Sequence, residues 1–169
     1  MKKALFVIDV QNCFVNSLTR GLPEKICRYI EENRKNYHLI IFTNFVNDPH
    51  SNVYRFLHWK KSMVSPEIDI VPKLQSVLKY GLVVPRSVYS VLKIPRVASL
   101  LKKREIEEIS LCGVDTDCCI LATAYDGFDQ GYRINLLENL CLDSSSIELH
   151  RAALLIFKRN LLYKEKKRL

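Results

Sequence analysis

The chain of 169 residues carries 26 lysine and arginine residues against 18 aspartate and glutamate residues, a formal net charge of +8. This length suits one domain, and a composition with 48% hydrophobic and 26% charged residues excludes a largely disordered chain. The sequence contains no run of about 20 apolar residues, so we expect no membrane span. The apolar run after Lys2 and Lys3 stops at Asp9, too early for a secretory signal, which predicts a cytoplasmic protein with reduced cysteines.

Short apolar segments alternate with amphipathic ones along most of the chain. The apolar segments predict five buried strands, at residues 4–10, 39–46, 81–84, 108–114 and 134–137. The intervening periodicity predicts a helix opening at Leu22-Pro23-Glu24 and further helices over 94–102 and 116–128, the last of these with Phe128 on its inner face. Strands this apolar are covered on both faces, so we expect a three-layer α/β/α sandwich with a central parallel, Rossmann-like sheet.

The final helix is expected to start at a capping box, Ser145-x-x-Glu148. Its predicted inner face carries four apolar residues, namely Leu149, Ala152, Ala153 and Ile156. Beyond it, a basic tail over about residues 160–169 holds much of the positive charge. Such a tail can bind nucleic acid through phosphates, but a solvated terminus explains it equally well, and we do not expect a nucleic-acid partner.

Polar residues follow three of the predicted strands, at residues 9–12, at Arg86 and at 115–119. Ligands of parallel sheets bind at the carboxyl ends of the strands, so these positions are candidates for a functional site. Asp9 directly follows a buried strand, where a carboxylate needs a partner or undergoes an upward pKa shift. The alternative is that Asp9 only caps the following loop.

Cys119 lies at the start of a predicted helix, just after a strand. The helix dipole and free N–H groups at such a position favour a thiolate and can hold an oxyanion. The alternative is a core cysteine on a buried helix face, since cysteine is often an ordinary small hydrophobic residue. The position therefore predicts a nucleophile without requiring one.

Four segments of the sequence resemble the isochorismatase-like cysteine hydrolases, the superfamily of nicotinamidase and N-carbamoylsarcosine amidase. The resemblance covers nearly the whole chain in the correct order. It is carried by Val7-Ile8-Asp9-Val10-Gln11-Asn12-x-Phe14, Tyr89-Ser90, Leu111-Cys112-Gly113-Val114-x-Thr116-Asp117-x-Cys119-Ile120-x-Ala122-Thr123-Ala124-x-Asp126, and Gly131-Tyr132.

The resemblance implies a catalytic cysteine at Cys119 and an aspartate at Asp9. It also implies a cis peptide bond between Val114 and Asp115, with the amides of Cys118 and Cys119 forming an oxyanion hole. The family is further expected to self-associate, which implies a homo-oligomer.

One departure from the family pattern concerns the catalytic lysine, whose position is occupied by Arg86. Arginine keeps the positive charge, but its guanidinium is longer, planar and too basic to transfer a proton. Arg86 can therefore replace the lysine if only charge is needed, and impairs catalysis if a proton must move. A third possibility is a loop arginine that faces solvent.

The segment between residues 47 and 80 is too long for a simple connection and is expected to shape a binding site. Phe14, Trp59 and Tyr89 are candidate walls of a substrate pocket, although aromatic residues in loops often serve packing. The resemblance to nicotinamidases raises Asp48, His50 and His58 as possible zinc ligands. Their spacing departs from the family pattern and equally suits a turn followed by a helix, so we predict no metal and no cofactor.

These features predict a cysteine hydrolase that cleaves an amide-like C–N bond of a small molecule through a thioester on Cys119. The alternative is a catalytically impaired member of the fold that binds a small molecule or a protein, with Arg86 as the cause. Hydrolysis of a vinyl ether, as in isochorismatase itself, is less favoured because that chemistry does not need the cysteine that this chain retains.

Overall fold

The computed structural model describes residues 1–163, and its centre is one five-stranded sheet. The strands are β1 (Lys3–Ile8), β2 (Leu39–Phe45), β3 (Leu82–Arg86), β4 (Glu108–Gly113) and β5 (Arg133–Cys141). They lie in the order β3-β2-β1-β4-β5, and every neighbouring pair is parallel. The parallel sheet predicted from the apolar segments is thereby confirmed.

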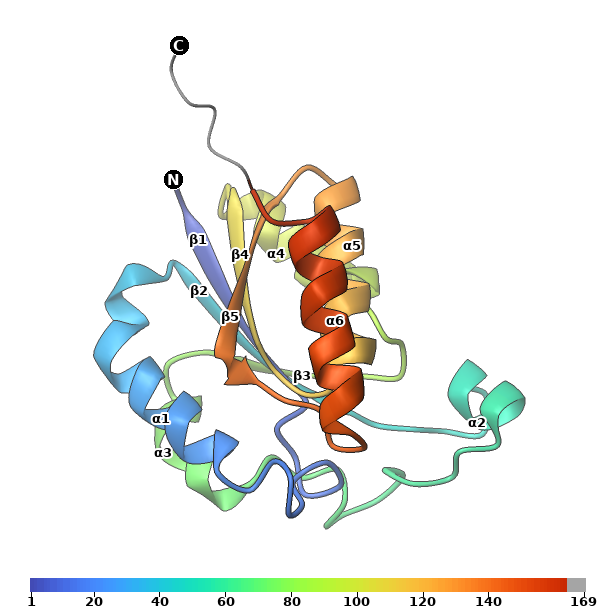
Figure 1. Cartoon of the computed structure of the whole chain (residues 1–169). Helices are drawn as coiled ribbons and strands as arrows, with labels where there is room; N and C mark the ends of the chain where they lie inside the picture. Colours follow the sequence, from blue (N-terminus) through green and yellow to red (C-terminus); the bar gives the residue numbers. More distant parts are fainter. Residues whose placement is uncertain (164–169) are drawn as a thin grey trace.

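Helices cover both faces of the sheet (Figure 1). One face carries α1 (Leu22–Asn33) and α3 (Gln75–Leu78), and the other carries α4 (Pro95–Lys103), α5 (Leu121–Asp129) and α6 (Ile147–Asn160). Short 3₁₀ turns occur at Arg34–Asn36, Pro72–Leu74 and Val91–Lys93. The three-layer α/β/α architecture is confirmed, and no helix within residues 1–163 is long and apolar enough to cross a membrane.

The first strand is the centre of the core, because residues 4–8 are at most 1% exposed. Its neighbour β4 packs so closely that a Cβ atom at Gly113 would lie 2.1 Å from the carbonyl oxygen of Ile8. Gly113 also has a φ of +118°, a backbone conformation that residues other than glycine rarely adopt. After β3 the chain crosses back to β4, so the strand order reverses between β1 and β4, where open α/β sheets bind their ligands.

The long segment after β2 lies against the carboxyl edge of the sheet. It contains α2 (Asn52–Leu57), which projects away from the sheet (Figure 1). Hydrogen bonds from Gln11, whose side chain is completely buried, hold this segment in place. The Gln11 amide nitrogen donates to the carbonyl of Phe45 at 3.0 Å and to the hydroxyl of Ser62 at 2.7 Å.

The predicted start of the last helix is wrong, and of the four residues predicted for its inner face only Ala153 is buried. The cap is Ser146, whose hydroxyl accepts from the amides of Glu148 and Leu149, and not Ser145. The buried residues are His150, Ala153 and Phe157, whereas the predicted Leu149, Ala152 and Ile156 are exposed. The inner face therefore includes a polar residue that an apolar pattern leaves out, His150, whose ring is hydrogen-bonded to the Thr116 hydroxyl at 2.9 Å.

Two further sequence predictions differ from the structure, one for the end of α5 and one for the end of β5. Phe128, expected on the inner face of its helix, is 53% exposed at the end of α5. The fifth strand continues to Cys141 beyond the predicted residue 137, because an edge strand tolerates polar residues such as Glu138. Of the predicted basic tail, residues 164–169 lie outside the described residues.

Candidate active site

Three strands deliver Asp9, Arg86 and Cys119 to one point at the carboxyl edge of the sheet. Asp9 follows β1, Arg86 is the last residue of β3, and Cys119 lies in a single π-helical turn (Thr116–Ile120) after β4. An Arg86 Nη2–H group donates to Asp9 Oδ2, and both side chains are at most 1% exposed. The Cys119 thiol lies close enough to both groups to change the pKa of each. The structure therefore brings together the three residues that the sequence singled out.

Asp9 has an unusual backbone conformation as well as an unusual environment. Its φ is +53°, a left-handed conformation that aspartate adopts more readily than most residues. The second carboxylate oxygen accepts from the Thr43 hydroxyl at 2.7 Å. Burial raises the pKa of Asp9 above its usual value, while the Arg86 guanidinium and the Thr43 hydroxyl oppose that shift. A carboxylate with a raised pKa is a better proton acceptor than an ordinary one.

Arg86 is buried, so it is not the solvent-facing loop residue considered as one alternative. A second guanidinium N–H donates to the carbonyl of Val88, and the guanidinium carbon lies 5.5 Å from the centre of the Phe45 ring. Burial lowers the pKa of Arg86, but the charges of Asp9 and Cys119 raise it by more, so the group stays cationic. Its Nε atom is buried without a hydrogen-bond partner among the described residues.

Cys119 sits beside a second thiol, Cys118, which is more exposed. The hydrogen bond with Cys118 and burial together raise the pKa of the Cys119 thiol well above its usual value. The same hydrogen bond lowers the pKa of Cys118. In the resting site Cys119 is therefore a thiol, and its proton has to leave for a base when the sulfur attacks.

The peptide bond between Val114 and Asp115 is cis, and the π-helical turn follows directly. The Cys118 amide donates a long hydrogen bond of 3.3 Å to the carbonyl of Asp115. An oxyanion held by the Cys118 amide would have to share or replace this bond. The Asp115 carboxylate itself accepts from the backbone and side chain of Ser144 at 2.6 and 2.9 Å, which secures the turn against the loop after β5.

Two further carboxyl groups near the turn share a proton. Burial and a hydrogen bond with Asp143 raise the pKa of Asp117 to about 7. Burial also raises the pKa of Asp143, but its hydrogen bonds with Asp117 and Ser145 lower it by more, so the net shift is downward. Asp117 is therefore largely protonated below neutral pH, and it donates to the Asp143 carboxylate.

This proton sharing predicts a pH dependence of stability. Asp117 holds its proton in the folded state up to about pH 7 but loses it near 3.8 when unfolded. The free energy of unfolding should therefore fall as the pH rises from about 4 to 8. Asp117→Asn keeps a donor to Asp143 without a titrating proton. Between pH 5 and pH 8, the free energy of unfolding measured in urea should therefore fall less in this variant than in the unmodified chain. Asp115 and His150 contribute equally in the unmodified chain and in Asp117→Asn, so they do not affect the comparison. If the free energy of unfolding falls by the same amount in the two proteins, the assignment to Asp117 is wrong.

A cavity of about 460 Å³ opens beside Cys119. The rings of Phe14 and Trp59 stack with centroids 6.0 Å apart and planes within 5° of each other, and Phe45 packs edge-on against Trp59. Tyr89 also lines this cavity, so all three aromatic residues suggested by the sequence reach it. Sequence reasoning missed several other members of the site, including Thr43 and the cavity residues Val53, Leu57, Lys61 and Ser144.

The suggested zinc ligands lie in a turn after β2 and at the end of α2. The Asp48 carboxylate accepts from the backbone N–H of His50 at 2.8 Å, as expected of a turn. His58 is exposed where α2 ends, with a φ of +54°. Within residues 1–163, no three histidine, cysteine, aspartate or glutamate side chains gather as a metal site. The residues therefore suit the turn-and-helix alternative better than a zinc site.

A buried carboxylate, a buried cation and a cysteine thus meet at the carboxyl edge of the parallel sheet of this α/β protein, next to the switch point between β1 and β4. The chain belongs to the isochorismatase family, because the sequence model of the Isochorismatase domain matches residues 3–162. A Bacillus subtilis protein named "Uncharacterized isochorismatase family protein PncA" is 31% identical in an alignment of 161 positions that covers 79% of this chain and 82% of that protein.

Solved structures of the same fold include two amidases. The pyrazinamidase/nicotinamidase of Streptococcus mutans superimposes with a TM-score of 0.84 at 21% identity, over 95% of this chain and 97% of that one. The N-carbamoylsarcosine amidase of Thermoplasma acidophilum gives a TM-score of 0.81 at 20% identity, over 95% and 93% of the two chains. At these identities the superpositions establish the fold.

Proposed function

We propose that the protein is a single-domain cysteine hydrolase that cleaves the amide-like C–N bond of a small molecule. The observation that carries this proposal is the contact of Asp9, Arg86 and Cys119 in a buried cluster at the wall of a cavity. A carboxylate, a cation and a thiol assembled in this way provide a base, a fixed charge and a nucleophile. The structural relatives with amidase names, including enzymes named for nicotinamide and pyrazinamide, support the same reaction class.

The first half of the reaction forms a thioester. Asp9 takes the thiol proton of Cys119 as the sulfur attacks the amide carbonyl, and backbone N–H groups of the turn hold the oxyanion. The tetrahedral intermediate then expels the amine, which takes the proton from Asp9. The product of this half is an acyl group bound to the Cys119 sulfur, with the amine released.

The second half hydrolyses the thioester. Asp9, again a carboxylate, takes a proton from water as the water oxygen attacks the thioester carbonyl. The thiolate leaves and recovers that proton from Asp9, which restores the resting thiol and releases a carboxylic acid.

Arg86 moves no proton in this scheme. Its fixed charge holds Asp9 in place through the Nη2 hydrogen bond and offsets the negative charge of the thiolate.

The cavity suits a small planar amide. Its volume of about 460 Å³ and its aromatic lining favour a flat ring, and the Phe14–Trp59 stack provides a parallel surface for one. The competing function, binding without turnover, is favoured by the replacement of the family lysine by an arginine whose Nε lacks a partner among residues 1–163. The two functions differ in whether ammonia is released.

A screen for ammonia release tests the proposal. The purified full chain should release ammonia from at least one of a panel of small amides, comprising nicotinamide, pyrazinamide, benzamide, N-carbamoylsarcosine and short aliphatic amides. We expect the flat aromatic amides to be hydrolysed faster than the aliphatic ones because of the aromatic lining. A chain that binds these amides, as seen by quenching of Trp59 fluorescence, but releases no ammonia would instead support the non-catalytic function.

A further inference from the structure

A second cavity lies at the opposite edge of the sheet from the candidate active site. It has a volume of about 300 Å³ and is formed around the amino ends of β2 and β3. The length of β2 separates it from the cluster of Asp9, Arg86 and Cys119 by roughly 20 Å, at about 3.3 Å per residue. None of its lining residues contributes to the cavity beside Cys119. Whatever binds there is therefore spatially separate from the proposed reaction.

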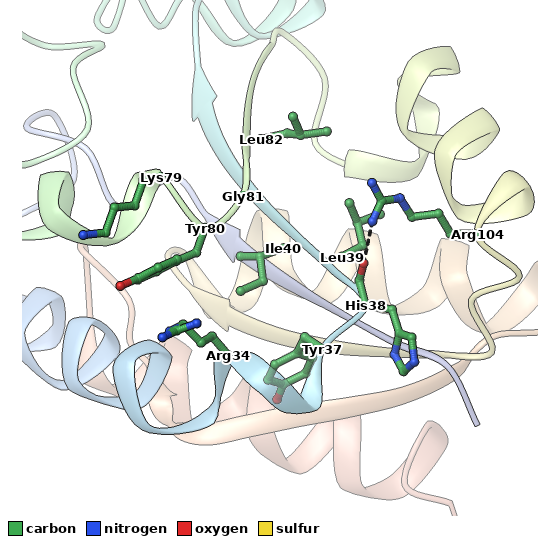
Figure 2. A pocket seen from close by; sticks show the side chains of 10 residues that line it. All are labelled: Arg34, Tyr37, His38, Leu39, Ile40, Lys79, Tyr80, Gly81, Leu82 and Arg104. Carbon is green, nitrogen blue, oxygen red and sulfur yellow. Dashed lines mark hydrogen bonds between the residues drawn. The ribbon is translucent and has the colours of Figure 1, made fainter.

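The distinctive property of this cavity is uncompensated positive charge. Three cations line it, namely Arg34, Lys79 and Arg104, and no aspartate or glutamate does. None of the ion pairs within residues 1–163 involves any of the three. In Figure 2, Arg34 and Lys79 lie on one side of the cavity and Arg104 on the other, with the apolar side chain of Ile40 between them.

Local contacts hold these cations in position. The guanidinium carbon of Arg34 lies 4.3 Å from the centre of the Tyr80 ring, and the Lys79 ammonium lies 5.2 Å from it. Across the cavity, the Arg104 guanidinium donates to the carbonyl of His38 at 2.7 Å (Figure 2). These interactions leave the remaining N–H groups available to a ligand while they restrict the side chains.

The backbone beneath Tyr80 is closely packed, which fixes the position of the aromatic ring. A Cβ atom at Gly81 would lie 2.6 Å from the carbonyl oxygen of Ile40, so only glycine allows this approach to β2. The Tyr37 hydroxyl is held by Tyr29 at 2.6 Å. These contacts restrict the aromatic part of the lining, which lowers the entropy cost of binding there, whereas Lys79 and Arg104 are exposed side chains.

We propose that this cavity binds a small organic polyanion that carries at least two phosphate or carboxylate groups. Guanidinium groups bind both kinds of anion through paired hydrogen bonds, and the ammonium of Lys79 adds a third charge. Cations on both sides of an apolar floor match a ligand with an anionic group at each end, whereas a single carboxylate would reach only one side. The proposal is independent of the amidase function.

Calorimetric titration of the full chain at low ionic strength tests this proposal with two probes, inorganic pyrophosphate and citrate. Lys79→Gln and Arg104→Gln should each weaken binding about tenfold, the loss of one charged contact, and the double variant more. Lys103→Gln is the matched control, because Lys103 neighbours Arg104 but does not line the cavity. Thermal melting without ligand shows whether each variant is folded, and all four variants should match the unmodified chain.

The two probes separate the sources of the anion. Binding of pyrophosphate alone would assign the site to phosphate compounds, binding of citrate alone would assign it to polycarboxylates, and either result supports a polyanion site. The proposal is overturned if neither probe binds. It is also overturned if Lys103→Gln weakens binding as much as Lys79→Gln, because the anion would then be responding to the overall charge of +8.

Discussion

Replacement of Cys119 by alanine is expected to lower the turnover of any amide substrate by at least about a thousandfold, since the loss of a covalent nucleophile usually has effects of this size or larger. The thiol is the only proposed group that bonds to the substrate carbon. Cys119 is 7% exposed and packs among apolar residues, so the removal of one sulfur atom should leave the fold intact. Ammonia release under saturating amide measures the loss, and circular dichroism confirms the fold.

The matched control is Cys118→Ala, which removes the neighbouring thiol. We expect this variant to keep most of the turnover, because Cys118 forms no bond to substrate in the proposed reaction. Its absence removes a hydrogen bond that raises the pKa of Cys119, so the thiolate should form more readily. A loss of turnover in Cys118→Ala with retention in Cys119→Ala would reassign the nucleophile to the more exposed sulfur.

Replacement of Arg86 by methionine is expected to affect both stability and activity. It leaves the Asp9 carboxylate buried without its cation, which typically costs about 3–5 kcal/mol. Loss of the Arg86 charge raises the folded-state pKa of Asp9 further, so the loss of stability relative to the unmodified chain grows as the pH rises through the folded-state pKa of Asp9, which lies above 3.8. Urea unfolding at pH 5 and 7.5 should therefore show the larger deficit at pH 7.5, and turnover should fall with it.

Arg86→Lys is the control that keeps the charge. If the cation acts only through its charge, this variant should retain turnover to within about tenfold and most of the stability that methionine loses. If the unmodified chain is inert and Arg86→Lys releases ammonia, the arginine blocks catalysis. That result would favour the binding function over the hydrolase.

The fold could be predicted in outline because buried parallel strands leave a strong signal. The run Leu5-Phe6-Val7-Ile8 is apolar at every position, and in the structure it is the buried centre of the sheet. The polar residues at the ends of such runs, Asp9 and Arg86, were conspicuous for the same reason. Parallel topology then required their side chains to face one edge, which the ion pair between them shows.

The rest depended on contacts that no local pattern contains. Thr43 lies within an apolar strand, and only the approach of Asp9 makes its hydroxyl part of the site. The inner face of α6 was misassigned because it includes a polar residue, His150, whose ring is hydrogen-bonded to Thr116 far away in the sequence. The cavity residues Val53 and Leu57 belong to an irregular segment whose path is set by Gln11, a residue far away in the chain.

The strand order has a consequence for how activity arises during folding. Asp9, Arg86 and Cys119 follow three different strands, and β3 reaches the others only through β2. No contiguous half of the chain contains all three groups, so the cluster forms only when β1, β3 and the turn after β4 have come together, with β2 between β1 and β3. Under the proposed function, recovery of ammonia release after denaturation therefore requires the pairing of at least these four strands.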